Sequence, residues 1–249
     1  KAQAGLVLTA EYSDLWKEDK KTETNEVMFA LQHSAKHKIA SNYGKSYYPS
    51  DYSPNAGWAD YYGNEDFFKA YPNDDRKEWN YMTEWKIKSG EIIPYTESAD
   101  KLPAISKYYD YDEGAPGKSA QSNGITCIYR YAEVLLMYAE ASTRATNSVN
   151  QDALNAIQEV QKRAGYQNRQ IELTTTTEPA AFLTAVSNER GWEFFAEMKR
   201  WFELVRLEKV KEVRAEEWDA STFNTNHHYY FPVPYQQVDL AGWTNNAGY

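Results

Sequence analysis

Aromatic side chains are concentrated in the least regular part of the chain. Twelve of the 21 tyrosines lie between Tyr43 and Tyr111, together with three of the 8 tryptophans. Glycine, proline, asparagine and aspartate interrupt this stretch, so residues 40–125 show neither a helical nor a strand period. A long loop region inside a compact domain is usually functional or disordered, and a high aromatic content argues against disorder. We therefore expect residues 40–125 to form a loop-rich, ligand-binding region held on a scaffold that other segments provide.

The scaffold is predicted to be helical and to span residues 126–211. In Tyr129–Arg144, apolar residues recur at steps of three and four, which is the period of a buried helix. A second helix is expected over Asp152–Ala164, with Gly165 as its C-terminal stop. Because only a short polar link separates these helices, we expect an αα-hairpin of the tetratricopeptide kind. A third helix is expected to begin near Thr177 and to continue to the end of the range.

The two ends of the chain have weaker patterns. Residues 1–24 are helix-prone and polar, and residues 25–32 read as a short apolar strand or a buried segment. Residues 212–249 are expected to form an extended, proline-punctuated tail. A length of 249 residues is enough to bury a substantial core, so we expect residues 1–249 to form a single domain.

Charge and cysteine content exclude several classes of function. The formal net charge is −9 at pH 7 and no basic stripe is present, so nucleic acid is not an expected partner. Cys127 is the only cysteine, which rules out an intrachain disulfide and a thiolate zinc cage. The chain carries no phosphate-binding glycine loop and no hydrolase nucleophile motif, and we expect neither a cofactor nor a metal. No apolar run reaches the roughly 20 residues of a membrane-spanning helix.

Several short motifs follow one another in an order that resembles the SusD/RagB family. The most characteristic is RYAEVLLMYAEA at Arg130–Ala141. The others, in chain order, are NEVMF at 25–29, Asp74-Asp75-Arg76, Lys107-Tyr108, QKRAG at 161–165, ERGWEF at 189–194 with the following Arg200-Trp201-Phe202, FPVP at 231–234 and NNAGY at 245–249. Gly191 and Met198 depart from the family pattern, in which Arg and Gly are usual. Because the motifs keep their order over nearly the whole chain, the sequence is similar to the C-terminal part of such a protein.

The resemblance implies a fold, a location and a function. The fold is all-α, a tetratricopeptide-like superhelix with long aromatic-rich loops, of which the N-terminal half is expected to be missing before Lys1. The implied protein is a surface-exposed lipoprotein of the outer membrane, attached only through a lipid anchor that this chain lacks. Its implied partners are an oligosaccharide and a SusC-like TonB-dependent transporter. The implied activity is glycan binding without catalysis, so we do not expect an enzyme.

The aromatic loops supply the residue types that a sugar site needs. Sugars present CH-rich faces that pack on aromatic rings, while their hydroxyl groups need polar side chains nearby. Trp58 and Tyr61 lead the prediction because glycine, aspartate and asparagine flank them, away from any apolar period. The predicted ligand-binding residues are Trp58, Tyr61, Tyr62, Tyr47, Tyr48, Asp51, Asp60 and Asn64.

Two other functions use different residues. A glycoside hydrolase would need paired carboxylates, and Glu189, Glu193 and Glu197 are spaced by four residues. Arginines nearby make ion pairs between packed helices the simpler explanation. A protein–protein assembly module of the uptake complex would instead use the helical faces. Weaker patterns are the His33/His37 pair as metal ligands and Asp110–Gly114 as a calcium loop. The preferred interpretations are a solvated face for the histidines and an exposed turn for Asp110–Gly114.

Overall fold

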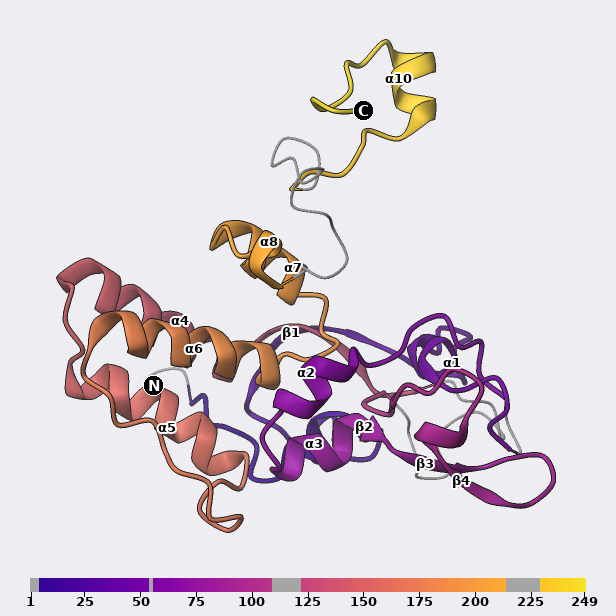
Figure 1. Ribbon diagram of the computed structural model, residues 1–249, viewed down its shortest axis with the longest axis horizontal. Helices are drawn as coiled ribbons and strands as arrows, with labels where there is room; N and C mark the ends of the chain where they lie inside the picture. Colours follow the sequence, from indigo (N-terminus) through magenta and orange to yellow (C-terminus); the bar gives the residue numbers. More distant parts are fainter. Residues whose placement is uncertain (1–4, 54–55, 109–121, 214–228) are drawn as a thin grey trace. The chain divides into compact units, whose positions relative to one another are not determined.

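The computed structural model describes residues 5–53, 56–108, 122–213 and 229–249, which fall into two compact units, Lys1–Glu197 and Met198–Tyr249 (Figure 1). In the first unit a group of helices lies at one end, and short helices, loops and hairpins lie at the other. The elements of this unit, in chain order, are η1 (Tyr12–Leu15), β1 (Val27–Gln32), α1 (Tyr43–Tyr47), α2 (Glu65–Ala70), α3 (Asp75–Asn80), β2 (Tyr81–Met82), β3 (Glu84–Lys86), β4 (Ile92–Pro94), η2 (Tyr95–Glu97), β5 (Ala104–Ile105), β6 (Ile125–Arg130), α4 (Tyr131–Thr146), α5 (Gln151–Arg163) and α6 (Pro179–Glu193).

Helices α4, α5 and α6 pack around an apolar core. Leu136 of α4, Ile157 of α5 and Phe182 of α6 are fully buried in it. The link between α4 and α5 is short because Asn147 takes a left-handed conformation and the side chain of Asn150 accepts a hydrogen bond from Ala153 N. The predicted helical hairpin is confirmed, with each helix within about two residues of its expected bounds.

The predicted third helix is too long. Helix α6 ends at Glu193, and the chain then turns with left-handed φ values of 58° at Ala196 and 61° at Met198. This turn lets Lys107 Nζ donate to Phe195 O at 2.6 Å and to Glu197 Oε1 at 2.7 Å. Neither glycine nor proline lies at the turn, so no helix-breaking residue predicts it.

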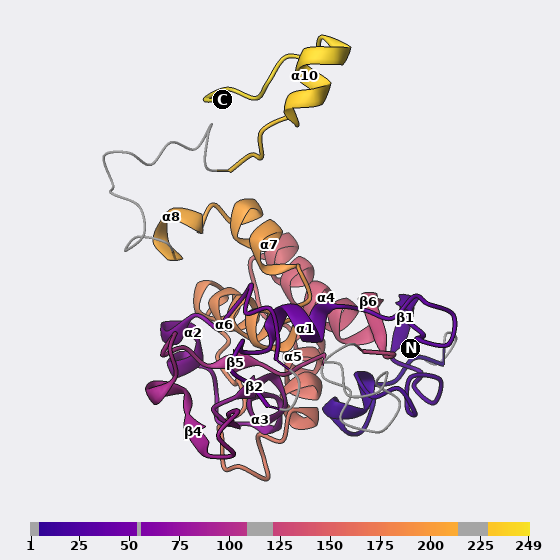
Figure 2. The same cartoon turned by 90° about the vertical axis from the view of Figure 1, so that its right-hand side faces the viewer.

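Short strands make the fold less purely helical than expected. Within the described residues, three two-stranded antiparallel sheets pair β1 with β6, β2 with β5, and β3 with β4. Figure 2 shows β1 beside β6, where β6 leads directly into α4. The strand expected at residues 25–32 is confirmed, but β6 was missed. Residues 1–24 form no helix in their described part beyond the single 3-10 turn η1, so the helix expectation there is wrong.

The second unit carries shorter elements. These are α7 (Arg200–Arg206), α8 (Val210–Val213) and α10 (Tyr235–Ala241), so the predicted extended tail contains a helix. The FPVP and NNAGY motifs contact each other, because Val233 N donates to Asn245 Oδ1 at 2.8 Å and Asn246 Nδ2 donates to Phe231 O at 2.6 Å. Across the described ranges, no helix is long and apolar enough to cross a bilayer.

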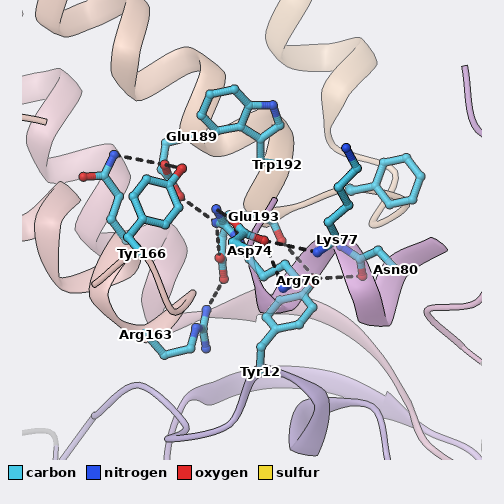
Figure 3. Close-up of polar contacts among 12 residues, drawn as sticks. Tyr12, Asp74, Arg76, Lys77, Asn80, Arg163, Tyr166, Glu189, Trp192 and Glu193 are labelled. Atoms are coloured by element: carbon cyan, nitrogen blue, oxygen red, sulfur yellow. Dashed lines mark hydrogen bonds and ion pairs between the residues drawn. The ribbon is translucent and has the colours of Figure 1, made fainter. Parts of the chain in front are cut away.

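A cluster of buried charges joins distant segments of the first unit. We call it the buried ion network, and Figure 3 shows the part of it formed by Asp74, Arg76, Arg163, Glu189 and Glu193. The side chains of its members have relative exposures of 0%, apart from Arg163 at 4%. The network comprises Arg76, Lys107, Arg130, Arg163, Glu26, Asp74, Glu189, Glu193 and Glu197.

Arginines at the centre of the network each bind several carboxylates. Arg130, at the end of β6, donates to Glu26 Oε1 and to Glu197 Oε1 at 2.8 Å each. Arg76 of α3 donates to Glu189 Oε1 at 2.6 Å, to Glu193 Oε2 at 2.8 Å and to Asp74 Oδ2 at 2.6 Å. Arg163 bonds Glu26 and Glu193. The carboxylates are therefore held by cations from segments far apart in the sequence.

Burying so many ions is costly, and their mutual attraction offsets that cost only while every partner is present. Replacing Arg130 with methionine leaves Glu26, Glu193 and Glu197 each short of a cation. We expect Arg130→Met to lower the free energy of unfolding by roughly 3–5 kcal/mol. The control is Lys69→Met, because Lys69 forms an exposed pair with Glu65 and should change stability by less than about 1 kcal/mol. Urea denaturation checks both, and equal losses would contradict the prediction.

Candidate functional site

The loop that carries Trp58 is fixed to the C-terminal end of α1. Trp58 N donates to Lys45 O at 2.7 Å, and Asp60 N donates to Ser46 O at 2.9 Å. These carbonyls belong to the last turn of α1, where helix carbonyls lack intrahelical partners. Ala59 N adds a bond of 3.0 Å to Tyr48 O. The segment 57–61 is therefore an ordered part of the surface.

Close backbone approach in this segment requires a glycine. A Cβ atom added at Gly57 would lie 2.0 Å from the carbonyl oxygen of Tyr48. Gly57 N also donates to Pro49 O at 2.9 Å. Only a residue without a side chain allows the loop to pass so close to residues 48–49.

Two of the predicted rings stand at the surface. Trp58 is 51% exposed and Tyr61 is 61% exposed. We call these two rings the aromatic platform. The ammonium of Lys45 lies 5.0 Å from the centre of the Trp58 ring, and Tyr47 packs against Tyr61 edge-on with ring centres 5.8 Å apart. Both rings are thus supported from α1 while keeping open area.

Tyr47 and Tyr48 occupy the interior, which corrects their predicted role. Tyr48 is 0% exposed and Tyr47 is 8% exposed, so neither ring is available to a ligand. Burial raises the pKa of Tyr47 to about 12. The Tyr47 ring stacks on Tyr108 at 6.0 Å, and Tyr108 packs on Trp16 at 5.5 Å. Tyr47 and Tyr48 therefore support the platform segment from the protein interior.

The predicted polar residues have mixed roles. Asn64 caps α2 by accepting from Phe67 N at 2.9 Å, and Asp51 accepts from Trp85 Nε1 at 2.8 Å. Tyr62 donates to Asp100 Oδ2 at 2.5 Å, and burial together with that bond raises the pKa of Tyr62. Asp60 is exposed. Asp60 is adjacent to the platform in the sequence, whereas the side chains of Asn64 and Tyr62 are hydrogen-bonded within the protein.

The supporting residues Trp16, Lys107 and Tyr108 were missed as part of the site. Lys107 Nζ lies 4.3 Å from the centre of the Trp16 ring and bonds Glu197, which connects the aromatic stack to the buried ion network. The Lys107-Tyr108 pair was visible in the sequence only as a family motif. Its position under the platform depends on contacts from residues more than 60 positions away.

The carboxylates considered for glycoside hydrolysis are inaccessible. The side chains of Glu189, Glu193 and Glu197 are all 0% exposed, and each forms ion pairs. Burial raises the pKa of Glu189, although Arg76 opposes it. For Glu193, burial acts in the same direction, but Arg163, Arg130 and Arg76 more than offset it and hold the pKa well below its usual range. The ion-pair interpretation is confirmed, and hydrolysis by these carboxylates is contradicted.

The weaker metal patterns gain no support. His33 bonds Thr126 Oγ1 at 2.7 Å through Nε2 and lies 3.2 Å from Ile39 O through Nδ1. In the described part of the chain, no group of three or more His, Cys, Asp or Glu side chains could hold a metal ion. Asp110–Gly114 lies outside the described residues.

Comparison with known proteins identifies the family of the chain. Residues 83–249 match the SusD family. The chain belongs to the SusD family. It is 28% identical over 200 residues to the SusD-like protein P2 of Formosa agariphila, an alignment that covers 73% of this chain and 39% of the relative. This chain therefore spans less than half the length of that relative.

Solved structures share the fold. A SusD superfamily protein from Parabacteroides distasonis superposes with a TM-score of 0.78 at 22% identity, over 100% of this chain and 55% of the other. Surface glycan-binding protein A from Bacteroides thetaiotaomicron, solved in complex with laminarihexaose, superposes with a TM-score of 0.68 at 24% identity, over 97% of this chain and 56% of the other. The fold is therefore SusD-like, mostly helical with short strands.

We expect Gly57→Ala to disturb the platform segment. The added methyl group meets the Tyr48 backbone, so the loop must shift at a cost of roughly 1–3 kcal/mol in the free energy of unfolding. Gly5→Ala is the control: its new Cβ meets nothing within 4 Å, although φ of +64° costs about 1 kcal/mol. Urea denaturation measures both losses. A smaller loss for Gly57→Ala than for Gly5→Ala would contradict this account.

A pH dependence follows from Lys107. Burial, partly opposed by Glu197, lowers its pKa to about 8 from the ordinary 10.5. Between these values the unfolded chain keeps a proton that the folded chain has released, so the free energy of unfolding rises with pH by up to roughly 1.4 kcal/mol per unit. The difference in unfolding free energy between the unaltered chain and Lys107→Met should grow from pH 8 to pH 10. Below pH 7 this difference in unfolding free energy should be constant. A difference that is also constant from pH 8 to pH 10 would contradict the prediction.

Proposed function

We propose that this chain binds a glycan on the aromatic platform and catalyses no reaction on it. The observation that carries the proposal is the exposure of Trp58 and Tyr61 on a segment pinned to α1 by backbone hydrogen bonds. A ring fixed in advance loses little conformational entropy when a ligand packs on it. The platform is therefore suited to stacking against the CH face of a sugar, with Asp60 beside it as a hydrogen-bond acceptor.

Family relationships support the same proposal. A protein with a similar fold was solved with laminarihexaose bound, and another is described as a laminarin-binding SusD-like protein. Sequence identities of 24% and 20% indicate a shared fold but do not identify a shared ligand, so experiment must identify the glycan. The burial of the paired carboxylates supports binding without hydrolysis.

The wider setting of the protein is also part of the proposal. We infer that the complete protein lies on the outer membrane through a lipid anchor and delivers oligosaccharide to a SusC-like TonB-dependent transporter. The support is membership of the SusD family together with the motif order described above. The α4–α5 hairpin is proposed as one unit of a tetratricopeptide-like superhelix, since it packs through one face against α6.

Replacing the platform rings tests the binding site. Trp58→Ala and Tyr61→Ala should each weaken glycan binding about fivefold, because each removes a stacking surface worth about 1 kcal/mol. Trp243→Ala and Tyr235→Ala are matched controls, since both rings are exposed in the second unit. Affinity electrophoresis against laminarin, starch, xylan and pectin provides the measurement. Binding that survives the Trp58→Ala, Tyr61→Ala double variant would overturn the site.

One observation favours a second function, that of an assembly module. Val134, Met137 and Tyr138 are 42%, 54% and 44% exposed on one face of α4. Exposed apolar residues at helical spacing are typical of surfaces that contact another protein. If assembly were the sole function, substitutions on this face would disrupt complex formation while Trp58→Ala had no effect on uptake.

A further inference from the structure

A hollow with polar and apolar walls lies between residues 50–53 and the turn that connects β3 to β4. Its volume is about 500 Å³, which is within the range of small-ligand sites. Ala56 lines the hollow and precedes Trp58 by two residues, so their Cα atoms are at most about 7 Å apart. The polar lining residues are Ser50, Asp51, Ser53, Lys88 and Ser89.

The walls of the hollow are held by specific contacts. Tyr52 and Ile87 form an antiparallel bridge, and Ser53 N donates to Lys86 O at 2.8 Å. The Tyr52 ring packs edge-on against buried Tyr48, with ring centres 4.7 Å apart. The opposite wall is a tight turn in which Ile87 N donates to Glu91 O at 2.8 Å. Both walls are therefore formed before any ligand arrives.

Charged groups with unused hydrogen-bonding capacity line the hollow. Asp51 Oδ1 accepts from the indole of Trp85, which fixes the carboxylate, whereas Oδ2 has no partner within the described residues. The ammonium of Lys88 is exposed and has no partner in the same ranges. A fixed carboxylate oxygen accepts from sugar hydroxyls, and an ammonium donates to them. The half-buried side chains of Tyr52 and Ile87 supply apolar area for the ring of a sugar.

We infer that this hollow is a second sugar subsite, which binds a further unit of the glycan that stacks on Trp58 and Tyr61. The inference rests on the proposed function. It adds Lys88 and Ser89, in the turn between β3 and β4, to the residues that contact the glycan. The opposite charges of Asp51 and Lys88 balance, so the hollow offers no net charge to a sugar acid. The hollow therefore selects a neutral sugar unit, and only an oligosaccharide long enough to reach from the platform engages it.

Chain-length dependence of binding tests the subsite. The probes are laminarihexaose, maltohexaose and xylohexaose, their three-unit forms, and hexagalacturonate, each titrated calorimetrically into the 249-residue chain. The variants are Asp51→Asn, which keeps an acceptor for Trp85, and Lys88→Ala. Matched controls are Asp66→Asn and Lys36→Ala, which alter exposed residues outside the hollow. Both hollow variants should weaken binding of the best hexaose about tenfold and that of its triose less than twofold.

The possible outcomes separate the subsite from the proposed function. If the unaltered chain binds a hexaose, Trp58→Ala weakens it, and both hollow variants match their controls, the subsite is overturned and the proposed function stands. Equal weakening of hexaose and triose also overturns the subsite, because the effect would then lie at the platform. Tighter binding of hexagalacturonate than of every neutral hexaose overturns the neutral-sugar assignment. Failure of the unaltered chain to bind any probe overturns the subsite together with the proposed function.

Discussion

The first unit depends on the pairing of its buried charged groups. Nine ionisable side chains lie within its interior, and carboxylates outnumber cations by five to four. Such a cluster is tolerated only when each member has its partners in good geometry. Because Glu26, Arg76, Arg130 and Glu193 come from separate segments, satisfying the charges also fixes how β1, α3, β6 and α6 meet.

The motifs of the family acquire a common physical explanation here. Glu26 belongs to NEVMF, Arg76 to the Asp-Asp-Arg motif and Arg163 to QKRAG, and all three end in the same cluster. Lys107 and Arg130 add two more motifs. Motifs that are far apart in the sequence thus meet in one three-dimensional cluster. It supports the aromatic platform through Lys107, Trp16 and Tyr108, yet presents none of its own groups to a ligand.

Sequence periodicity was sufficient where packing is local. It predicted α4, α5 and the start of α6, because each buries one apolar stripe against its neighbours. It failed at the turn after Glu193, which is set by the distant partners of Glu197, and at β6, whose strand is defined by pairing with β1. For the site, exposure of Trp58 and Tyr61 followed from their polar flanks, whereas burial of Tyr47 and Tyr48 depends on α1 and Tyr108. Long-range contacts of this kind leave no local pattern.

The long sequence separations within the buried ion network bear on how the chain folds. Arg130 meets Glu26 across 104 positions, and Arg76 meets Glu193 across 117. Contacts so distant along the chain are associated with slow folding, since loop closure must precede their formation. Because Glu197 is the last member along the sequence, the cluster cannot close until nearly four-fifths of these 249 residues take part in folding. Arginines and glutamates of the earlier segments therefore stay hydrated until the partners that neutralise them arrive.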